Sequence, residues 1–391
     1  MHERSGYDRI LMISALILVV LGIVMIYSSS AFIAMQRYNT PFYFLRNQVV
    51  WAVIGIIGMV VAKNFDYKKL KSLSLPLIVI SVLLLIIVLI PNIGKEVNGA
   101  RRWLRVLGFS FQPSELAKLT LIISISAYIA KRSDRMGDFV YGFFPPVVLL
   151  GAFQIPIIFQ PDIGTALGLG IMVITLLYIG GVKVPHILSL GIPLTPFIVK
   201  IVFNEGYRKK RLIAFIDPWS DPTGAGFQVI QSSLALGSGG IFGLGLGEGK
   251  QKLFFLPEPH TDFIYSLIGE ELGFLGASLV IFLYLIILWR GTRIAVRTED
   301  LFGRFLAMGL TIMIGVQAMM NLGVASGLLP PKGLPLPFVS FGGSSLLINM
   351  IALGILLNIS KSINTISLAQ SSSIKRESWV KSKSRKDSVN L

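Results

Sequence analysis

Several kinds of residue are scarce or missing in this sequence of 391 residues, and their absence limits the chemistry it can support. There is no cysteine, which excludes disulfides and thiolate metal sites but leaves the cellular compartment open. Only three histidines are present, and neither an H-E-x-x-H motif nor a nucleophile elbow occurs. Dedicated zinc chemistry and acyl-enzyme chemistry therefore have no support in the sequence.

Charged residues are also few, at 14% of the chain, against about 25% in a typical soluble domain. Hydrophobic residues reach 53% and the mean hydropathy is +0.72, so we expect an all-α polytopic membrane protein. The net charge of +16 raises nucleic acid as a partner. The basic residues lie in short loops and a tail, without a nucleic-acid-binding motif, which fits orientation in a membrane instead.

Apolar runs long enough to cross about 30 Å of hydrocarbon recur along the chain. The seventh run is interrupted by Pro193 and Pro196 and contains Lys200, although such breaks are tolerated where neighbouring helices satisfy the backbone. The first is longer than the apolar region of a signal peptide. The ten predicted spans are 10–32, 45–62, 74–91, 113–130, 142–158, 162–181, 185–203, 263–289, 305–328 and 338–360.

The distribution of Lys and Arg predicts how the chain is oriented. An even number of spans places both termini on one side, and the excess of positive charge on that side predicts that it is cytoplasmic. We therefore expect a cytoplasmic N-terminus at 1–9, a ten-span membrane domain at 10–360 and a basic cytoplasmic tail at 361–391. The tail is rich in Ser, Lys and Arg, a composition typical of disorder.

Two predicted outer loops carry more positive charge than orientation requires. The first, 92–112, contains Arg101 and Arg102 next to Trp103 in a compact NGARRWL segment; the second, 204–262, is too long for a passive connector. Lys and Arg suit phosphate groups, which favours an anionic ligand. Contact with acidic lipid headgroups is the alternative. The glycine-rich middle of the second loop predicts a segment that dips into the membrane edge.

Helices that enter from the outer face begin with polar sequences such as QPSELAK and QPDIGT. Ordinary capping explains much of this pattern, including Asp162. It does not explain Lys118, which follows Glu115 by three residues and lies with it on one helical face about one turn inside. The two side chains form either a local ion pair or the lining of a polar cavity, where Lys118 meets a substrate anion.

The stretch 256–273 concentrates ionisable groups at the start of an apolar helix. Asp262 lies at the helix mouth; Glu270 lies about 12 Å deeper and is rotated from it by about 80°, and Glu271 by about 180°. They cannot all face one reacting atom. We therefore expect Asp262 to act as a base, while Glu270 and Glu271 brace helices or line the cavity. His260 is an acid, a base, a ligand or an ordinary hydrogen-bonding residue.

These motifs give the chain a resemblance to a known family. QPSELAK, QPDIGT, RLIAFIDPWSDPTGAGFQVIQS, LPEPHTDFIYSLIGEELG and PKGLPLPFVSFGGSSLL occur in the order seen in the SEDS proteins of bacterial cell-wall synthesis, which comprise FtsW, RodA and SpoVE. The resemblance covers 10 to about 359. LPEPHTDF and KGLPLPFVSFGGSSLLIN are more similar to the division branch than to the elongation branch.

The resemblance implies a peptidoglycan glycosyltransferase in the cytoplasmic membrane, which polymerises lipid II into glycan linked to undecaprenyl diphosphate. Its implied partners are a class B penicillin-binding transpeptidase and other division proteins. By motif position, the essential aspartate of the family falls on Asp262 and its polar cavity pair on Glu115 and Lys118. Glu258 and Lys332 also match positions of importance, and we add His260, Arg101 and Arg102 as substrate-binding candidates.

The implied reaction supplies a mechanistic hypothesis. Asp262 takes a proton from a sugar hydroxyl, and Arg101, Arg102 and Lys118 stabilise the leaving diphosphate. A divalent cation, Mg or Mn, is a possible participant, although no ligand cluster in the sequence demands one. A lipid II flippase is the rival function, because a polar cavity also suits transport. The ionisable residues lie in the predicted outer half, which favours the enzyme.

Overall fold

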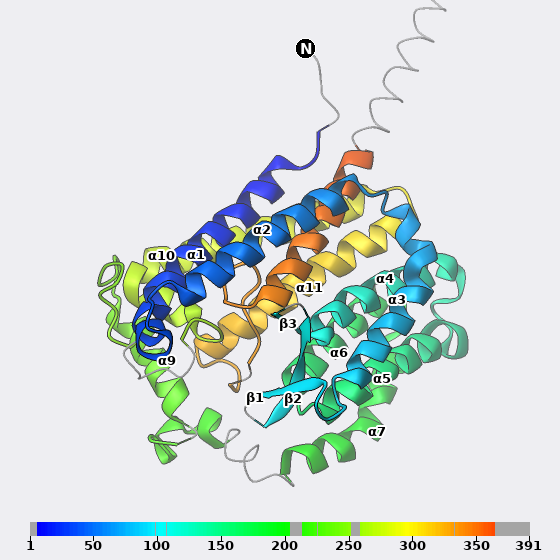
Figure 1. The fold of residues 1–391 in the computed structure, drawn as a ribbon. Helices are drawn as coiled ribbons and strands as arrows, with labels where there is room; N and C mark the ends of the chain where they lie inside the picture. The colour runs from blue at the N-terminus through cyan, green and yellow to red at the C-terminus, as the bar shows by residue number, and fades with distance from the viewer. Residues whose placement is uncertain are drawn as a thin grey trace, which may run out of the picture.

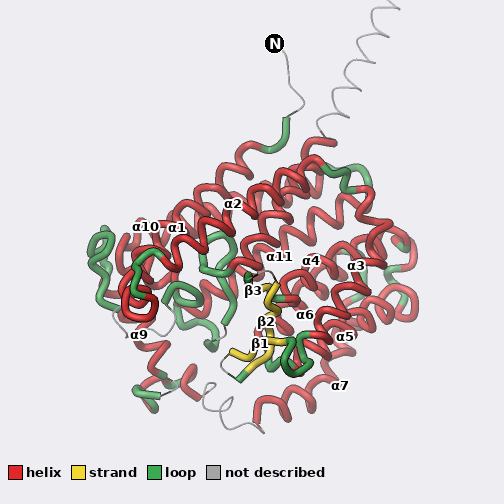
Figure 2. Tube along the Cα trace, in the orientation of Figure 1, coloured by secondary structure: helices red, strands yellow, loops and turns green. Residues whose placement is uncertain are grey.

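The fold was analysed in a computed structural model, which describes residues 6–97, 99–106, 108–203, 213–224, 226–251, 259–331 and 333–363. Helices dominate it, with one small sheet among them (Figures 1 and 2). The helices are α1 Arg9–Tyr38, α2 Tyr43–Asn64, α3 Lys68–Ile87, α4 Pro113–Lys131, α5 Phe144–Phe159, α6 Ile163–Ile179, α7 Val184–Phe203, α9 Phe227–Ser238, α10 Ile264–Arg297, α11 Leu301–Ala325 and the final helix Gly343–Ile363. Short helical turns are η1 Ser133–Arg135, η2 Phe139–Phe143 and η3 Pro218–Ser220.

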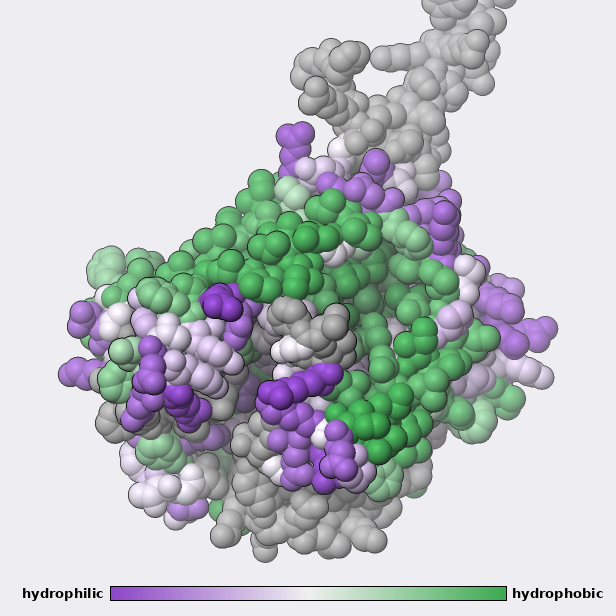
Figure 3. All heavy atoms as spheres, in the orientation of Figure 1, coloured by the Kyte–Doolittle hydropathy of each residue, from purple (hydrophilic) through white to green (hydrophobic). Residues whose placement is uncertain are grey.

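Each of the ten predicted spans contains one of these helices, which confirms a helical, multi-pass membrane protein. Within the described ranges, seven helices are long and apolar enough to cross a membrane, and α6 is a shorter apolar helix. The number of ten crossings stays a prediction. Apolar side chains point outward along the bundle, as lipid contact requires. Figure 3 shows this hydrophobic surface over α2 and α3 and hydrophilic side chains over the sheet.

The predicted outer loop 92–112 forms a small antiparallel sheet that the sequence analysis did not anticipate. Its strands are β1 Gly94–Val97, β2 Ala100–Val106 and β3 Phe109–Phe111, in the order β1-β2-β3. Glycines with positive φ lie between the strands, at Gly99 (75°) and Gly108 (84°), as tight turns require. The short strands carry charged residues instead of a long apolar alternation, which is why the pattern was missed.

Polar contacts join the two ends of the membrane domain. Asp8 caps α1 by accepting a hydrogen bond from the Leu11 amide (3.0 Å), and its own amide donates to Ser360 Oγ of the final helix (3.0 Å). The Asp8 carboxylate also binds Arg290 of α10, with Nε to Oδ2 at 2.7 Å. The start of α1 and the end of the final helix therefore lie together, as an even number of crossings requires. Their cytoplasmic location stays a prediction.

Helix α10 packs against α1, α9 and α11 and is broken near its outer end. Gly273 has φ 67° and ψ −165°, a conformation open essentially to glycine alone. The loop 240–251 fills the break, because the Phe274 and Leu275 amides donate to the carbonyls of Gly240 and Ile241 (2.9 and 3.2 Å). In return, the Glu270 and Glu271 carbonyls accept from Leu244 and Gly245 (3.0 and 3.1 Å). The loop thus replaces the helical hydrogen bonds that the kink removes.

Replacing Gly273 with alanine should destabilise the protein by on the order of 3 kcal/mol or more, because a side chain is strained at this φ and has no space. A Cβ atom there would lie 2.3 Å from the Gly243 nitrogen. The measurement is thermal melting of the purified variant in detergent. Gly151→Ala in α5 is the matched control, since its Cβ meets no atom within 4 Å. Equal melting temperatures for the two variants would contradict the structural role of the kink.

Candidate active site

The mouth of α10 is fixed by hydrogen bonds to three consecutive carbonyl groups. His260 O accepts from the Phe341 amide (2.9 Å), Thr261 O from Ser340 Oγ (2.6 Å) and Asp262 O from Asn321 Nδ2 (2.9 Å). The donors belong to α11 and to the segment that leads into the final helix. Asp262, which precedes the helix by two residues, is therefore held by elements distant in sequence.

The Asp262 side chain is half-buried and faces the last outer loop. A Cβ atom added to Gly333 would lie 2.9 Å from its Oδ2 atom, so the backbone of this loop passes directly beside the carboxylate. Glycine at 333 allows that approach. Asp262 thus lies partly exposed just before α10, and its role as a base stays a prediction. The predicted residues Glu258 and Lys332 both lie outside the described residues.

His260 is buried in a cluster of three aromatic rings, because Phe44 and Phe341 contact both His260 and each other. Its ring centroid is 4.3 Å from that of Phe44 and 5.4 Å from that of Phe341, and the residue is 4% exposed. Burial, with a smaller contribution from the charge of Arg37, lowers the pKa of His260 from 6.5 to about 4. The imidazole is therefore neutral at physiological pH, and its Nδ1 atom has no hydrogen-bond partner among the described residues.

Glu115 and Lys118 form the predicted pair at the start of α4. Glu115 Oε2 and Lys118 Nζ are 2.7 Å apart, and each side chain is 2% exposed. Helix α4 begins beside the final helix, because the Gln112 amide donates to Ser344 Oγ (3.0 Å). The local ion pair is thus present. Whether Lys118 also meets a substrate anion stays a prediction.

Several uncharged side chains near this end of the bundle are also buried without a hydrogen-bond partner in the described structure. The sequence analysis did not identify them, because a single Gln or Asn inside an apolar run gives no periodic signal. They are the amide of Gln48 in α2, the Ser114 hydroxyl in α4, and the Oδ1 atoms of Asn321 and Asn349. Buried polar groups left unpaired are costly, so they are a common mark of a site that binds water or ligand.

The two arginines on β2 are already engaged by the protein. Arg101 pairs with Glu96 at 3.1 Å on the exposed surface of the sheet. Arg102 donates to the carbonyls of Gln160 (3.0 Å) and Pro161 (2.6 Å), at the turn between α5 and α6. Arg101 thus joins two strands within the sheet, and Arg102 connects the sheet to the helices.

The remaining predicted carboxylates have structural partners. Asp162 caps α6 by accepting from the Thr165 amide (3.2 Å), as its position predicted. Glu270 accepts from the Lys250 and Gln251 amides (2.7 and 3.2 Å). Glu271 accepts from Ser28 Oγ (2.6 Å) and the Gly247 amide (3.2 Å). The two glutamates brace the loop 240–251 against α10 and α1, which confirms the bracing interpretation.

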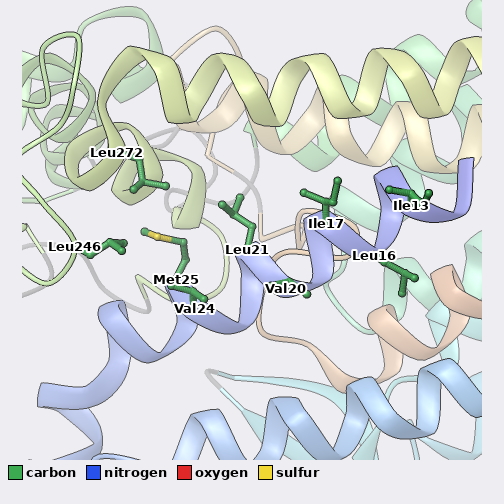
Figure 4. Close-up of a pocket in the computed structure, with 9 residues that line it drawn as sticks. All are labelled: Ile13, Leu16, Ile17, Val20, Leu21, Val24, Met25, Leu246 and Leu272. Carbon is green, nitrogen blue, oxygen red and sulfur yellow. The ribbon is translucent and has the colours of Figure 1, made fainter. Parts of the chain in front are cut away.

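Two further features bear on the chemistry. An apolar groove of about 500 Å³ runs along α1, ends at Leu246 and Leu272, and offers no polar group for catalysis (Figure 4). In the described ranges, no three His, Asp or Glu side chains gather in a way that could hold a metal ion. These residues therefore provide no protein ligands for the predicted Mg or Mn ion, and its participation stays a prediction.

The sequence of this chain is similar to those of a known protein family. The sequence model described as "Cell cycle protein", which covers FtsW, RodA and SpoVE, matches residues 8–365. A probable peptidoglycan glycosyltransferase FtsW of Geobacter sp. (strain M18) is 48% identical over 360 residues, covering 92% of this chain and 98% of the relative. The stage V sporulation protein E of Bacillus subtilis is 42% identical with the same coverage of both chains.

Solved structures agree in fold. A chain of a peptidoglycan synthase complex described as coordinating polymerization and crosslinking superposes with a TM-score of 0.75 at 31% identity, covering 91% of this chain and 98% of that one. The crystal structure of the rod shape determining protein RodA of Thermus thermophilus gives a TM-score of 0.66 at 28% identity, covering 91% and 97%. The chain belongs to the FtsW, RodA and SpoVE family of cell cycle proteins.

Proposed function

We propose that this chain is a peptidoglycan glycosyltransferase that polymerises lipid II at the outer face of the cytoplasmic membrane, in septal wall synthesis. The observation that carries the proposal is the half-buried Asp262, whose backbone is fixed at the mouth of α10. Arg290 of the same helix binds Asp8. At a rise of 1.5 Å per residue, Arg290 lies on the order of 40 Å from Asp262 along the helix. The relatives named as FtsW support the division branch of the family.

The reaction joins two sugars through one displacement. The 4-hydroxyl oxygen of an incoming lipid II sugar attacks the anomeric carbon of the growing glycan with inversion. The bond from that carbon to the lipid diphosphate breaks, and the diphosphate leaves with the bonding electrons. Asp262 takes the hydroxyl proton, an effect worth about 10² to 10⁴ in rate. His260 is less suited to this role, because it is 4% exposed and its ring packs against Phe44 and Phe341.

Lys118 is the better supported of the predicted diphosphate contacts. An ammonium has three N–H donors, and the Nζ atom lies against a single carboxylate, that of Glu115. Arg101 and Arg102 instead already bind Glu96 and two carbonyls, so we assign them to fixing the sheet. A divalent cation carried on the substrate diphosphate would share the charge. That role is a proposal without protein ligands among the described residues.

The partner we propose is a class B penicillin-binding transpeptidase, together with other division proteins. Support comes from the similar chain that belongs to a peptidoglycan synthase complex. Coupling to a crosslinking enzyme also suits the chemistry, because newly made glycan has to be crosslinked where it emerges.

Replacing Asp262 with asparagine should lower glycan synthesis by at least about 10²-fold, because the amide is a poor proton acceptor of similar shape. The measurement is polymerisation of lipid II by the purified protein with its transpeptidase in detergent. Asp162→Asn is the matched control, since this residue also precedes an outer helix and an amide can still cap α6. Glycan made by Asp262→Asn at the normal rate would reject the assignment. Absence of glycan from the wild-type protein, with lipid II transfer across vesicles, would favour the flippase.

Replacing Lys118 with methionine should lower stability by about 3–5 kcal/mol, because it leaves the Glu115 carboxylate buried and unpaired. The double variant Glu115→Gln/Lys118→Met removes both charges and should recover most of this loss in a thermal melt. If Lys118 binds the diphosphate, the double variant remains inactive although it is folded. Recovery of polymerisation together with stability would reduce the pair to a structural role.

Acidification should destabilise the wild-type protein through His260. Its folded pKa of about 4 lies below the ordinary 6.5, so the unfolded chain binds the proton more readily. The contribution, on the order of 3 kcal/mol, is present above pH 6.5 and is lost as the pH falls towards 4. Melting curves of wild type and His260→Phe, which keeps a ring without a titrating group, measure this term. Parallel pH profiles for the two proteins would refute it.

A further inference from the structure

Asn321 connects the two elements that meet at Asp262. It lies in α11 and is 1% exposed. Its Nδ2 atom donates to Asp262 O at 2.9 Å and to Leu334 O at 2.7 Å. One side-chain amide therefore uses both of its N–H donors on carbonyl groups from two different outer segments. The first belongs to the mouth of α10 and the second to the loop that follows α11.

The amide of Asn321 fixes the distance between the Asp262 and Leu334 carbonyls. The two N–H bonds of a planar amide diverge at a set angle, so the carbonyls they bind are held at a set separation. The Leu334 carbonyl follows Gly333, whose backbone passes beside Asp262 Oδ2. Holding these two carbonyls together therefore holds the carboxylate against the loop. Among the described residues, these are the hydrogen bonds that join both the loop and the mouth to α11.

The Oδ1 atom of Asn321 lowers stability instead of adding to it. This atom is buried and has no hydrogen-bond partner among the described residues. An unpaired buried acceptor costs about 1–3 kcal/mol. A packing residue of similar size, such as leucine, would avoid that cost but would provide no donor. The function of an amide at this position is therefore to bind these two carbonyls.

We propose that Asn321 is a positioning residue for the glycosyl transfer, which acts by holding the Asp262 carboxylate beside the loop that begins at residue 333. The inference rests on the proposed role of Asp262 as the base. Helix α11 has no ionisable group at the site. Through Asn321 it would nevertheless determine the position of Asp262 relative to the sugar hydroxyl. A displacement of about 1 Å at a reacting group can cost on the order of 100-fold in rate.

Gln317 provides a matched control one helical turn deeper. It lies in α11 on the same face as Asn321, is 3% exposed, and also has a buried oxygen without a hydrogen-bond partner in the described part of the chain. Gln317→Met and Asn321→Leu each replace a buried amide by an apolar side chain of similar size. Only Asn321→Leu removes donors to the Asp262 and Leu334 carbonyls.

The experiment measures lipid II polymerisation and amide hydrogen exchange for both variants, with the transpeptidase present in the activity assay. We expect Asn321→Leu to lower kcat by on the order of 100-fold while KM changes by less than about threefold. Exchange should become faster in peptides covering 259–263 and 333–340. Gln317→Met should retain activity and protection. Asn321→Leu should melt at a lower temperature than Gln317→Met, because it leaves the Asp262 and Leu334 carbonyls without this donor.

Two results would overturn the inference. One is a normal kcat for Asn321→Leu in an assay where Asp262→Asn is inactive, which leaves the base assignment intact. The other is equal loss of activity and protection in both variants, which reduces Asn321 to ordinary packing. Failure of the proposed function would look different, since Asp262→Asn would then itself make glycan.

Discussion

A polar group inside hydrocarbon has no water to bind, so each one must find its partner within the protein. That constraint organises this structure. Glu270 and Glu271 are buried, and their carboxylates bind backbone amides of a loop. Asp8 and Arg290 neutralise each other where α1 meets α10. Charges that would otherwise oppose insertion are thereby used to hold segments together that are far apart in sequence.

The candidate site contains both polar groups that have partners and polar groups that have none in the described structure. Backbone carbonyls at the mouth of α10 are all paired, which makes the frame around Asp262 rigid. Several side-chain groups near this end of the bundle are buried without a hydrogen-bond partner in the described part of the chain, among them the amide of Gln48. A rigid frame with unused hydrogen-bonding capacity is what a site needs if the substrate is to supply the missing partners.

Composition and apolar run length predicted the helical membrane fold, because both follow from the requirement for internal hydrogen bonding. The sequence spacing predicted the Glu115 and Lys118 pair, because residues three apart on a helix lie next to each other on its surface. The partners of Asp262 were not predictable in this way. Asn321 is distant from Asp262 in the chain, and the sheet at 94–111 lacks the apolar alternation that marks a strand. Engagement of Arg102 by two carbonyls depends equally on tertiary proximity.

The exchange of hydrogen bonds at the break in α10 limits how this region can change during evolution. Loop carbonyls at 240 and 241 meet helix amides at 274 and 275, while helix carbonyls at 270 and 271 meet loop amides at 244 and 245. An inserted or deleted residue on either side would move every pair out of register at once. Homologous chains should therefore vary this loop by substitution and keep its length constant.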